Sequence, residues 1–232
     1  MIGGKSVTVI IPALNEEASI ARVIDLIPNW VDRVIVADNG STDSTARLAE
    51  DAGAEIVAAP RRGYGSACLA GIDAAGPTDV MVFLDGDLAD DPTGMSALVE
   101  PIVDGRAELV IGSRTLGIAE TGALTFAQRF GNRLACTLLR IIWGARFTDL
   151  GPFRAIECAA LRRLAMQDPD YGWTVEMQIK AARHGLVCLE VPVPYRRRVG
   201  RSKISGTIRG TLAAGAKILW IIAKHSTSRR QA

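Results

Sequence analysis

Histidine and paired cysteine are scarce in this sequence. The chain of 232 residues has two histidines, His184 and His225, so a Ser-His-Asp or Cys-His catalytic arrangement has little to draw on. The four cysteines stand far apart and form no Cys-x-x-Cys pair, which excludes the usual zinc and redox motifs. We therefore expect reduced core thiols and a chemistry that relies on other side chains.

Long hydrophobic runs are missing as well. The N-terminal apolar run stops at Pro12 and is too short for the apolar core of a secretory signal, so we expect a cytoplasmic protein. The apolar segment 206–224 contains Arg209 and Lys217, whereas a membrane-spanning helix needs about 20 apolar residues. Its periodicity predicts a basic amphipathic helix, either lying in a lipid interface or packed on the domain with its lysines outward. The predicted apolar stripe consists of Ile208, Leu212, Leu219, Ile222 and Ala223.

Acidic residues are absent from the last part of the chain. All 25 Asp and Glu precede residue 191, whereas residues 191–232 carry ten Lys and Arg. Such a basic tail favours a polyanion or an anionic membrane surface. Because aromatic residues do not alternate with these basic residues, a nucleic-acid-binding module is the least favoured interpretation.

The pattern of the first half predicts an α/β fold. Strand-like apolar runs end at Pro12, Asp38, Ala58, Asp85 and Ile111, with helical patterns or small-residue turns between the first four. This alternation predicts a doubly wound, mostly parallel sheet with helices on both faces. In the first unit we expect Asn15 to cap a helix. Its predicted sheet-facing stripe is Ile20, Val23, Ile24 and Ile27.

The pattern changes after Arg114. The sequence there predicts helices near 125–143 and 173–184, and short strands at 153–156 and 187–193. No linker separates the two halves, so we expect one compact unit. We divide it into a first half (1–115), a second half (116–205) and a basic amphipathic C-terminal segment (206–232).

Two carboxylates follow the strand predicted to end at Asp85. In open α/β sheets, ligands bind beyond the carboxyl ends of the strands. Asp85 and Asp87 are therefore placed to share a hard cation with a diphosphate. A second such pair, Asp168 and Asp170, lies in an ordinary turn and carries no such prediction. Asp38, at another strand end, is placed to bind a ribose or a base.

Glycines open the helix predicted after the third strand. In Gly63-Tyr64-Gly65 they either let backbone N–H groups and the helix N-terminus approach a phosphate, or form a plain tight turn. Arg61 and Arg62 stand beside them and supply positive charge.

Five motifs together resemble the family two glycosyltransferases of the GT-A fold. They cover roughly residues 5 to 115 and read VTVIIPALNEE, VIVADNGSTDST, RRGYGSACLAGI, VFLDGDLADDP and LVIGSR. The second half resembles the dolichol-phosphate mannose synthase and polyprenyl-phosphate glycosyltransferase branch. Its motifs are AQRFGNRLA, TDLGPFRAI, YGWTVEMQIKAARHG and VPVPYRRRVGRSKISG.

The resemblance implies an inverting, metal-dependent transfer of a hexose from a UDP- or GDP-sugar to a polyprenyl phosphate. It implies that residues 1–115 are the nucleotide-sugar-binding half and residues 116–205 the acceptor-side half. It also implies a Mg or Mn ion at Asp85 and Asp87. The implied nucleotide-pocket residues are Pro12, Leu14, Asn15, Glu16 and Asp38. We add Gly63, from the glycine-containing turn described above. The implied phosphate and acceptor contacts are Arg114, Arg129, Arg201 and Lys203. We count Asp85, Asp87, Arg114 and Arg129 as the candidate catalytic residues.

The nature of the acceptor decides whether a base is needed. A lipid phosphate is already ionised near neutral pH, whereas a hydroxyl acceptor must lose a proton to a carboxylate. Candidates for that role are Glu176, Asp149 and Asp91. The alternative function is therefore a soluble glycosyltransferase acting on a small hydroxyl acceptor. For a lipid acceptor, the amphipathic segment or a separate membrane subunit would hold the protein at the cytoplasmic face of the membrane.

Overall fold

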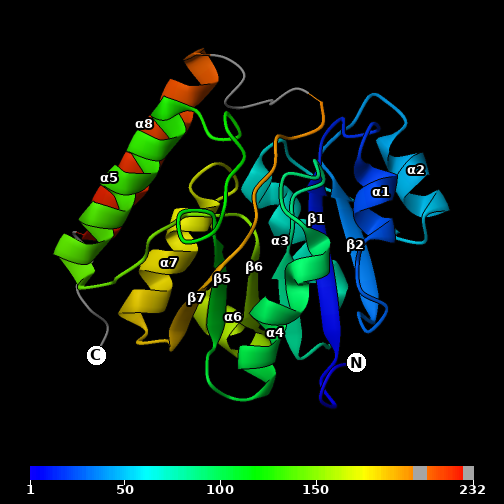
Figure 1. The fold of residues 1–232 in the computed structure, drawn as a ribbon, viewed down its shortest axis with the longest axis horizontal. Helices are drawn as coiled ribbons and strands as arrows, with labels where there is room; N and C mark the ends of the chain where they lie inside the picture. The colour runs from blue at the N-terminus through cyan, green and yellow to red at the C-terminus, as the bar shows by residue number, and fades with distance from the viewer. Residues whose placement is uncertain (201–207, 227–232) are drawn as a thin grey trace.

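A computed structural model describes residues 1–200 and 208–226 of the chain (Figure 1). Its strands are β1 (Val7–Ala13), β2 (Arg33–Asp38), β3 (Glu55–Ala58), β4 (Val80–Phe83), β5 (Leu109–Ser113), β6 (Arg154–Glu157) and β7 (Cys188–Pro192). Its α-helices are α1 (Ile20–Asp25), α2 (Thr45–Asp51), α3 (Tyr64–Ala75), α4 (Ser96–Val103), α5 (Phe126–Trp143), α6 (Cys158–Leu164), α7 (Trp173–Arg183) and α8 (Ile208–Ser226). A short 3-10 helix spans Pro92–Met95.

The seven strands form one mixed, mostly parallel sheet in the order β3-β2-β1-β4-β6-β5-β7. Only β6 runs antiparallel to its neighbours β4 and β5. Strand β6 thus lies beside β4 but runs in the opposite direction, and at this point the strand order departs from that of repeated βαβ units. Such switch points are where open α/β sheets bind their ligands.

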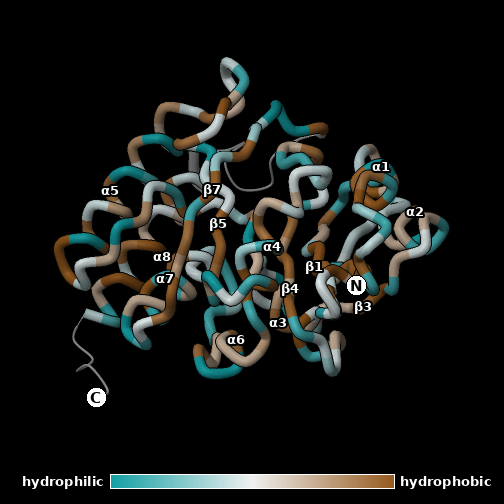
Figure 2. The backbone as a smooth tube through the Cα atoms, turned by 60° about the horizontal axis from the view of Figure 1, so that its bottom comes forward, coloured by the Kyte–Doolittle hydropathy of each residue, from teal (hydrophilic) through white to brown (hydrophobic). Residues whose placement is uncertain are grey.

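Helices cover both faces of the sheet. One apolar core lies between the strands and α1, α2 and α4, and a second lies between the strands and α3, α6 and α7. Figure 2 shows the central strands in the hydrophobic colours that burial on both faces requires. The fold class and the strands expected in the first half are confirmed.

A third core joins helices α5, α7 and α8 outside the sheet. It contains Leu139 from α5, Ile179 from α7, Ile221 from α8, and Leu150 from the loop before β6. Figure 1 shows α5 and α8 running side by side at the edge of the molecule. These three helices form a layer beside the sheet, which α7 also contacts through the second core.

One expectation about the first helix is wrong. Asn15 does not cap the first helix, because α1 begins at Ile20 after Ser19. Asn15 instead has φ 52° and accepts a hydrogen bond from Thr42 N at 2.8 Å, which joins two loops. The predicted stripe from Ile20 to Ile27 is buried as expected.

Helix α8 packs through a face that contains only part of the predicted stripe, namely Ile222. Ile221 and Ile222 are 2% and 3% exposed, whereas Leu212 and Leu219 are 68% and 43% exposed. Lys217 points inward to Asp168 rather than outward. None of the helices in the described part of the chain is long and apolar enough to cross a bilayer.

Candidate active site where two cavities meet

The candidate site lies just beyond the carboxyl end of β4. Asp85 and Asp87 follow that strand, and both line two adjoining cavities of about 330 and 960 Å³. Asp87 is buried, and its Oδ1 accepts a hydrogen bond from Ala89 N at 2.9 Å. The acids predicted from the strand pattern therefore stand where the two cavities join.

The pKa of the Asp85 carboxyl is raised above its usual value. Burial, and next the negative charge of Asp87, raise the pKa of the Asp85 carboxyl to about 7. Tyr64, the first residue of α3, donates its hydroxyl to Asp85 Oδ1 at 3.1 Å. The site therefore concentrates negative charge that a bound cation would relieve.

Arg198 supplies a positive charge at the same place. Its Nη2 lies 2.6 Å from Asp87 Oδ2 and 3.5 Å from Glu16 Oε1. The position follows from backbone pairing, because Val199 N donates to Asp87 O at 2.9 Å. Sequence analysis singled out the basic segment but did not distinguish Arg198 from its neighbours.

The smaller cavity contains four of the six predicted nucleotide-pocket residues. Pro12, Leu14, Glu16 and Gly63 line it. Asn15 and Asp38 do not line it; the Asp38 carboxylate accepts from Ser41 N at 3.2 Å. Other lining residues were not predicted from the sequence, among them Asn39, Tyr64, Asp170 and Tyr171.

The glycines before and within α3 serve close packing rather than an open phosphate loop. Gly63 has φ 139°, and a Cβ on Gly63 or Gly65 would collide with the backbone of 168–169. The amides point to protein acceptors: Gly63 N donates to Asn39 Oδ1 at 2.7 Å, and Ser66 N donates to Pro169 O at 2.8 Å. The amides of Gly63 and Ser66 are therefore engaged within the protein, which favours the tight turn of the two interpretations.

The second Asp-x-Asp pair, Asp168 and Asp170, does not lie in an ordinary turn. Asp168 is buried, and its Oδ1 accepts from the backbone N–H groups of Asp170 and Gly172 at 2.9 and 3.1 Å. Its Oδ2 lies 2.8 Å from Lys217 Nζ on α8. These contacts shape a loop whose Asp170 and Tyr171 form one wall of the smaller cavity.

The larger cavity runs between α5, α8 and the end of the sheet. Thr211, Ala214 and Ile218 of α8 are among its lining residues. It is rich in guanidinium groups, which come from Arg114, Arg129, Arg133, Arg140 and Arg198. The predicted residues Arg114 and Arg129 thus share one cavity, whereas Arg201 and Lys203 lie outside the described residues.

Arg114 is held firmly at this cavity. Its Nε and backbone N donate to Asp149 Oδ2, both at 2.8 Å, and its Nη2 donates to Oδ1 at 2.6 Å. The guanidinium lies 5.0 Å from the Tyr195 ring centre. Burial works against the charge, but hydrogen bonds to Asp149 outweigh it and raise the pKa of Arg114.

All three carboxylates considered as a base are already engaged. Asp149 binds Arg114, and Glu176 binds Lys180 at 2.8 Å as well as the backbone N–H of Asp168 at 2.7 Å. Asp91 caps the 3-10 helix and pairs with Arg196. Of the three, only Asp149 lines the larger cavity.

Comparisons with known proteins agree with this geometry. The family model described as Glycosyl transferase family 2 matches residues 8–167. An uncharacterised glycosyltransferase of Mycobacterium tuberculosis is 34% identical over 220 residues, which cover 92% of this chain and 96% of that protein. An undecaprenyl-phosphate mannosyltransferase of Micrococcus luteus is 31% identical over 221 residues, covering 88% of this chain and 89% of that protein.

Solved structures show the same fold. Glucosyl-3-phosphoglycerate synthase from Mycobacterium tuberculosis, in complex with phosphoglyceric acid, superposes with a TM-score of 0.80 at 26% identity, covering 98% of this chain and 82% of that one. The same enzyme with Mn²⁺, UDP and glucosyl-3-phosphoglycerate gives a TM-score of 0.79.

Proposed function

The chain belongs to glycosyl transferase family 2, and on that premise we propose that it moves a hexose from a UDP- or GDP-sugar to a polyprenyl phosphate, with inversion at the anomeric carbon. It is a glycosyltransferase with a GT-A-type fold. The observation that carries the proposal is the meeting of two cavities at Asp85 and Asp87. The smaller cavity suits a nucleotide, and the arginine-lined larger one suits a phosphate.

The acidic pair fits a divalent cation. The described residues gather no group of three or more His, Cys, Asp or Glu side chains that could hold a metal alone. Asp85 and Asp87 therefore suit a hard ion such as Mg²⁺ or Mn²⁺, which takes its remaining ligands from a diphosphate and water. Such an ion supplies Lewis-acid stabilisation of the leaving diphosphate. The relative solved with Mn²⁺ and UDP supports this assignment.

The chain's own cations bind and orient the two substrates. Arg198 places a guanidinium beside Asp87, where it stabilises negative charge on the departing diphosphate. Arg114 and Arg129 hold the acceptor phosphate in line with C1 of the sugar. A phosphate oxygen then forms the new bond to C1, and the electron pair of the breaking C1–O bond leaves with the nucleoside diphosphate.

The engagement of the three carboxylates considered as a base agrees with an acceptor that is already ionised. A phosphate monoester needs no proton removal near neutral pH. The three carboxylates considered for that role, Asp91, Asp149 and Glu176, are all bound to cations.

Exposed hydrophobic side chains support a lipid acceptor presented at a membrane surface. Of the thirteen exposed large hydrophobic residues in the described part of the chain, eight lie on α5 or α8, the helices that border the larger cavity. Phe126 and Phe130 are 84% and 61% exposed beside Arg129. Apolar groups next to basic ones suit the interface of an anionic bilayer. We place the enzyme at the cytoplasmic face.

A second candidate acceptor is a small phosphorylated acid. The similarity to glucosyl-3-phosphoglycerate synthase favours it, because the arginines of the larger cavity suit any phosphate. This reaction needs a carboxylate to accept the hydroxyl proton. Asp149 lines the cavity but already binds Arg114 through both oxygens.

The test is transfer of radiolabelled hexose from UDP- and GDP-sugars, with Mn²⁺, to polyprenyl phosphate or to 3-phosphoglycerate in parallel. We expect a lipid-extractable product whose formation stops with EDTA. Arg129→Ala should raise the KM for polyprenyl phosphate about tenfold, the effect of losing one charged hydrogen bond, while UDP binding stays the same. A product found only in the aqueous phase would exclude the lipid acceptor.

A further inference from the structure

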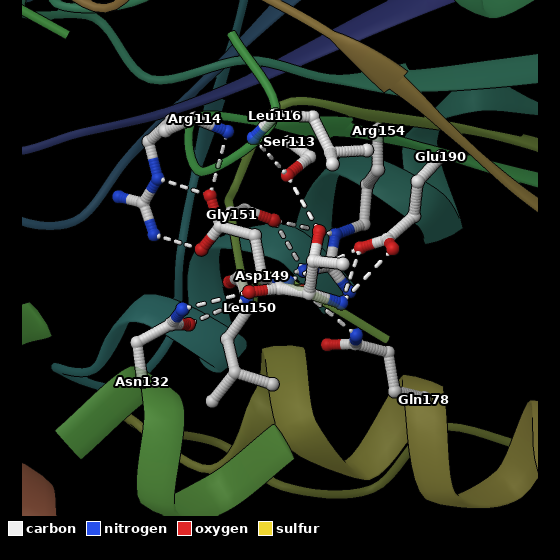
Figure 3. Close-up of polar contacts among 11 residues, drawn as sticks. Ser113, Arg114, Leu116, Asn132, Asp149, Leu150, Gly151, Arg154, Gln178 and Glu190 are labelled. Atoms are coloured by element: carbon white, nitrogen blue, oxygen red, sulfur yellow. Dashed lines mark hydrogen bonds and ion pairs between the residues drawn. The ribbon is translucent and has the colours of Figure 1, made fainter. Parts of the chain in front are cut away.

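The loop 148–151 lies between α5 and β6, outside the helices and strands. Although it has no ladder partners, side chains from four different elements bind its backbone (Figure 3). These side chains are Asn132 from α5, Arg154 from β6, Gln178 from α7 and Glu190 from β7. Since the loop carries Asp149, the network determines where that carboxylate stands.

Three of these side chains each bind one kind of backbone group: Glu190 binds N–H groups of the loop, whereas Gln178 and Arg154 bind its carbonyls. The Glu190 carboxylate accepts from Thr148 N at 2.9 Å and from Asp149 N at 3.1 Å. Gln178 Nε2 donates to Asp149 O at 2.9 Å. Arg154 is completely buried and donates to the carbonyls of Leu150 and Gly151; burial lowers the pKa of its guanidinium to about 10.

Asn132 differs because it binds on both sides of residue 149. Its Nδ2 donates to Thr148 O at 3.0 Å, and its Oδ1 accepts from Leu150 N at 2.8 Å. A primary amide can make these two bonds at once, since it has donor and acceptor side by side. Asn132 also belongs to the stretch of α5 that lines the larger cavity. It therefore ties the cavity wall to the peptide units that flank Asp149.

Asp149 in turn sets the direction of Arg114. Its two oxygens hold Nε, Nη2 and the backbone N–H of Arg114. The remaining nitrogen, Nη1, has no hydrogen-bond partner in the described part of the chain, and Figure 3 shows it pointing away from the network. This nitrogen and its two N–H donors are thus left for a ligand in the cavity.

We propose that Asn132 is a positioning residue for Arg114, acting through the Asp149 loop. It holds the carboxylate in the place where two guanidinium nitrogens are fixed and the third faces the acceptor. The inference rests on the proposed function in one respect, namely that Arg114 contacts the acceptor phosphate. The geometric part, that Asn132 determines the Arg114–Asp149 contact, can be tested without any acceptor.

The first measurement follows the Arg114 Nε–H in protein labelled with ¹⁵N-arginine, assigned with Arg114→Lys. Its exchange with solvent should be about tenfold faster in Asn132→Ala, because the bond to Asp149 is populated less when two loop bonds are lost. Asn132→Asp keeps the acceptor for Leu150 N and loses the donor to Thr148 O. It should show a smaller increase, and it serves as the test if Asn132→Ala does not fold.

The second measurement is a double-mutant cycle on transfer to polyprenyl phosphate. Asn132→Ala should lower kcat about tenfold by itself, yet change the residual rate of an Arg114→Ala enzyme by less than about twofold. UDP binding should be the same in all variants, because Asn132 does not line the smaller cavity.

Asn39 offers a matched control. It makes the same two-sided clamp on another loop, with Nδ2 donating to Arg61 O and Oδ1 accepting from Gly63 N, both at 2.7 Å. That loop borders the smaller cavity. Asn39→Ala should therefore weaken UDP binding about tenfold, for the loss of two comparable bonds, and leave Arg114 Nε–H exchange unchanged.

The outcomes separate the two proposals. If the wild-type enzyme does not glycosylate polyprenyl phosphate, the proposed function fails, and the exchange measurement still decides the role of Asn132. If exchange in Asn132→Ala and Asn132→Asp equals that of wild type, the positioning role is overturned. It is also overturned if Asn132→Ala lowers the rate equally with and without Arg114.

Discussion

Removing the ammonium group of Lys217 tests whether helix α8 supports the wall of the smaller cavity. Lys217 Nζ lies 2.8 Å from Asp168 Oδ2, and the aspartate side chain is only 3% exposed. The other oxygen of Asp168 accepts from backbone N–H groups in the loop that carries Asp170 and Tyr171. Lys217→Met therefore leaves a buried carboxylate with backbone donors but without its cation.

The size of the effect follows from the exposure of the pair. Breaking a fully buried ion pair by removing one partner costs about 3–5 kcal/mol, whereas an exposed pair contributes about 0–1 kcal/mol. Because 27% of the Lys217 side chain is exposed, we expect an intermediate loss of about 2 kcal/mol in the free energy of unfolding. For a chain of this length, that loss lowers Tm by about 4–8 °C.

Thermal unfolding with and without UDP and Mn²⁺ measures this prediction. Lys217→Met should lower Tm and also reduce the stabilisation by UDP, because the loop at Asp170 and Tyr171 loosens. Lys224→Met is the matched control: both lysines lie over the same Trp220 ring, at 4.9 and 5.2 Å. We expect the control to change stability by no more than about 0.5 kcal/mol. Equal Tm values for the two variants would refute the argument.

Two further predictions concern stability. Burial raises the pKa of the Asp90 carboxyl well above its usual range, so the folded protein binds that proton more tightly and its stability falls as pH rises above about 4. Asp90→Asn removes this dependence, and its Tm advantage over wild type should grow between pH 5 and pH 8; a constant difference would contradict the burial argument. Ile221→Ala, at a site 2% exposed in the core of α5, α7 and α8, should lose about 2–4 kcal/mol in urea unfolding. Leu212→Ala, at a site 68% exposed, should lose about 0.5 kcal/mol or less, and similar losses would show that the packing face is assigned wrongly.

Much of the fold could be predicted because its signals are local. An apolar run that ends at a turn identifies a buried strand without knowledge of its neighbours. The strands ending at Asp38 and Ala58 were predicted to the residue. The acids after β4 were found in the same way, because a short loop follows its strand directly. Where α8 packs could not be predicted, since the choice of face depends on the shapes of α5 and α7.

Contacts between distant segments could not be predicted. Gly63 and Gly65 looked like a phosphate loop, but the partner that fills the space beside them is the segment 168–169. Asp149 looked like a candidate base, but Arg114 neutralises it. In both cases the decisive neighbour lies far away in the sequence, and residue type alone does not reveal it.

The order of the strands and helices in the first half, the acidic pair after β4 and the basic character of the C-terminal segment are properties of the amino-acid sequence, because periodicity and composition act over a few residues. Only tertiary structure decided that Arg198 stands over Asp87, and that the loop around Asp149 is held by four separate elements. The physical reason is that the direction and charge state of a polar group depend on the groups around it, and folding brings these together from remote parts of the chain.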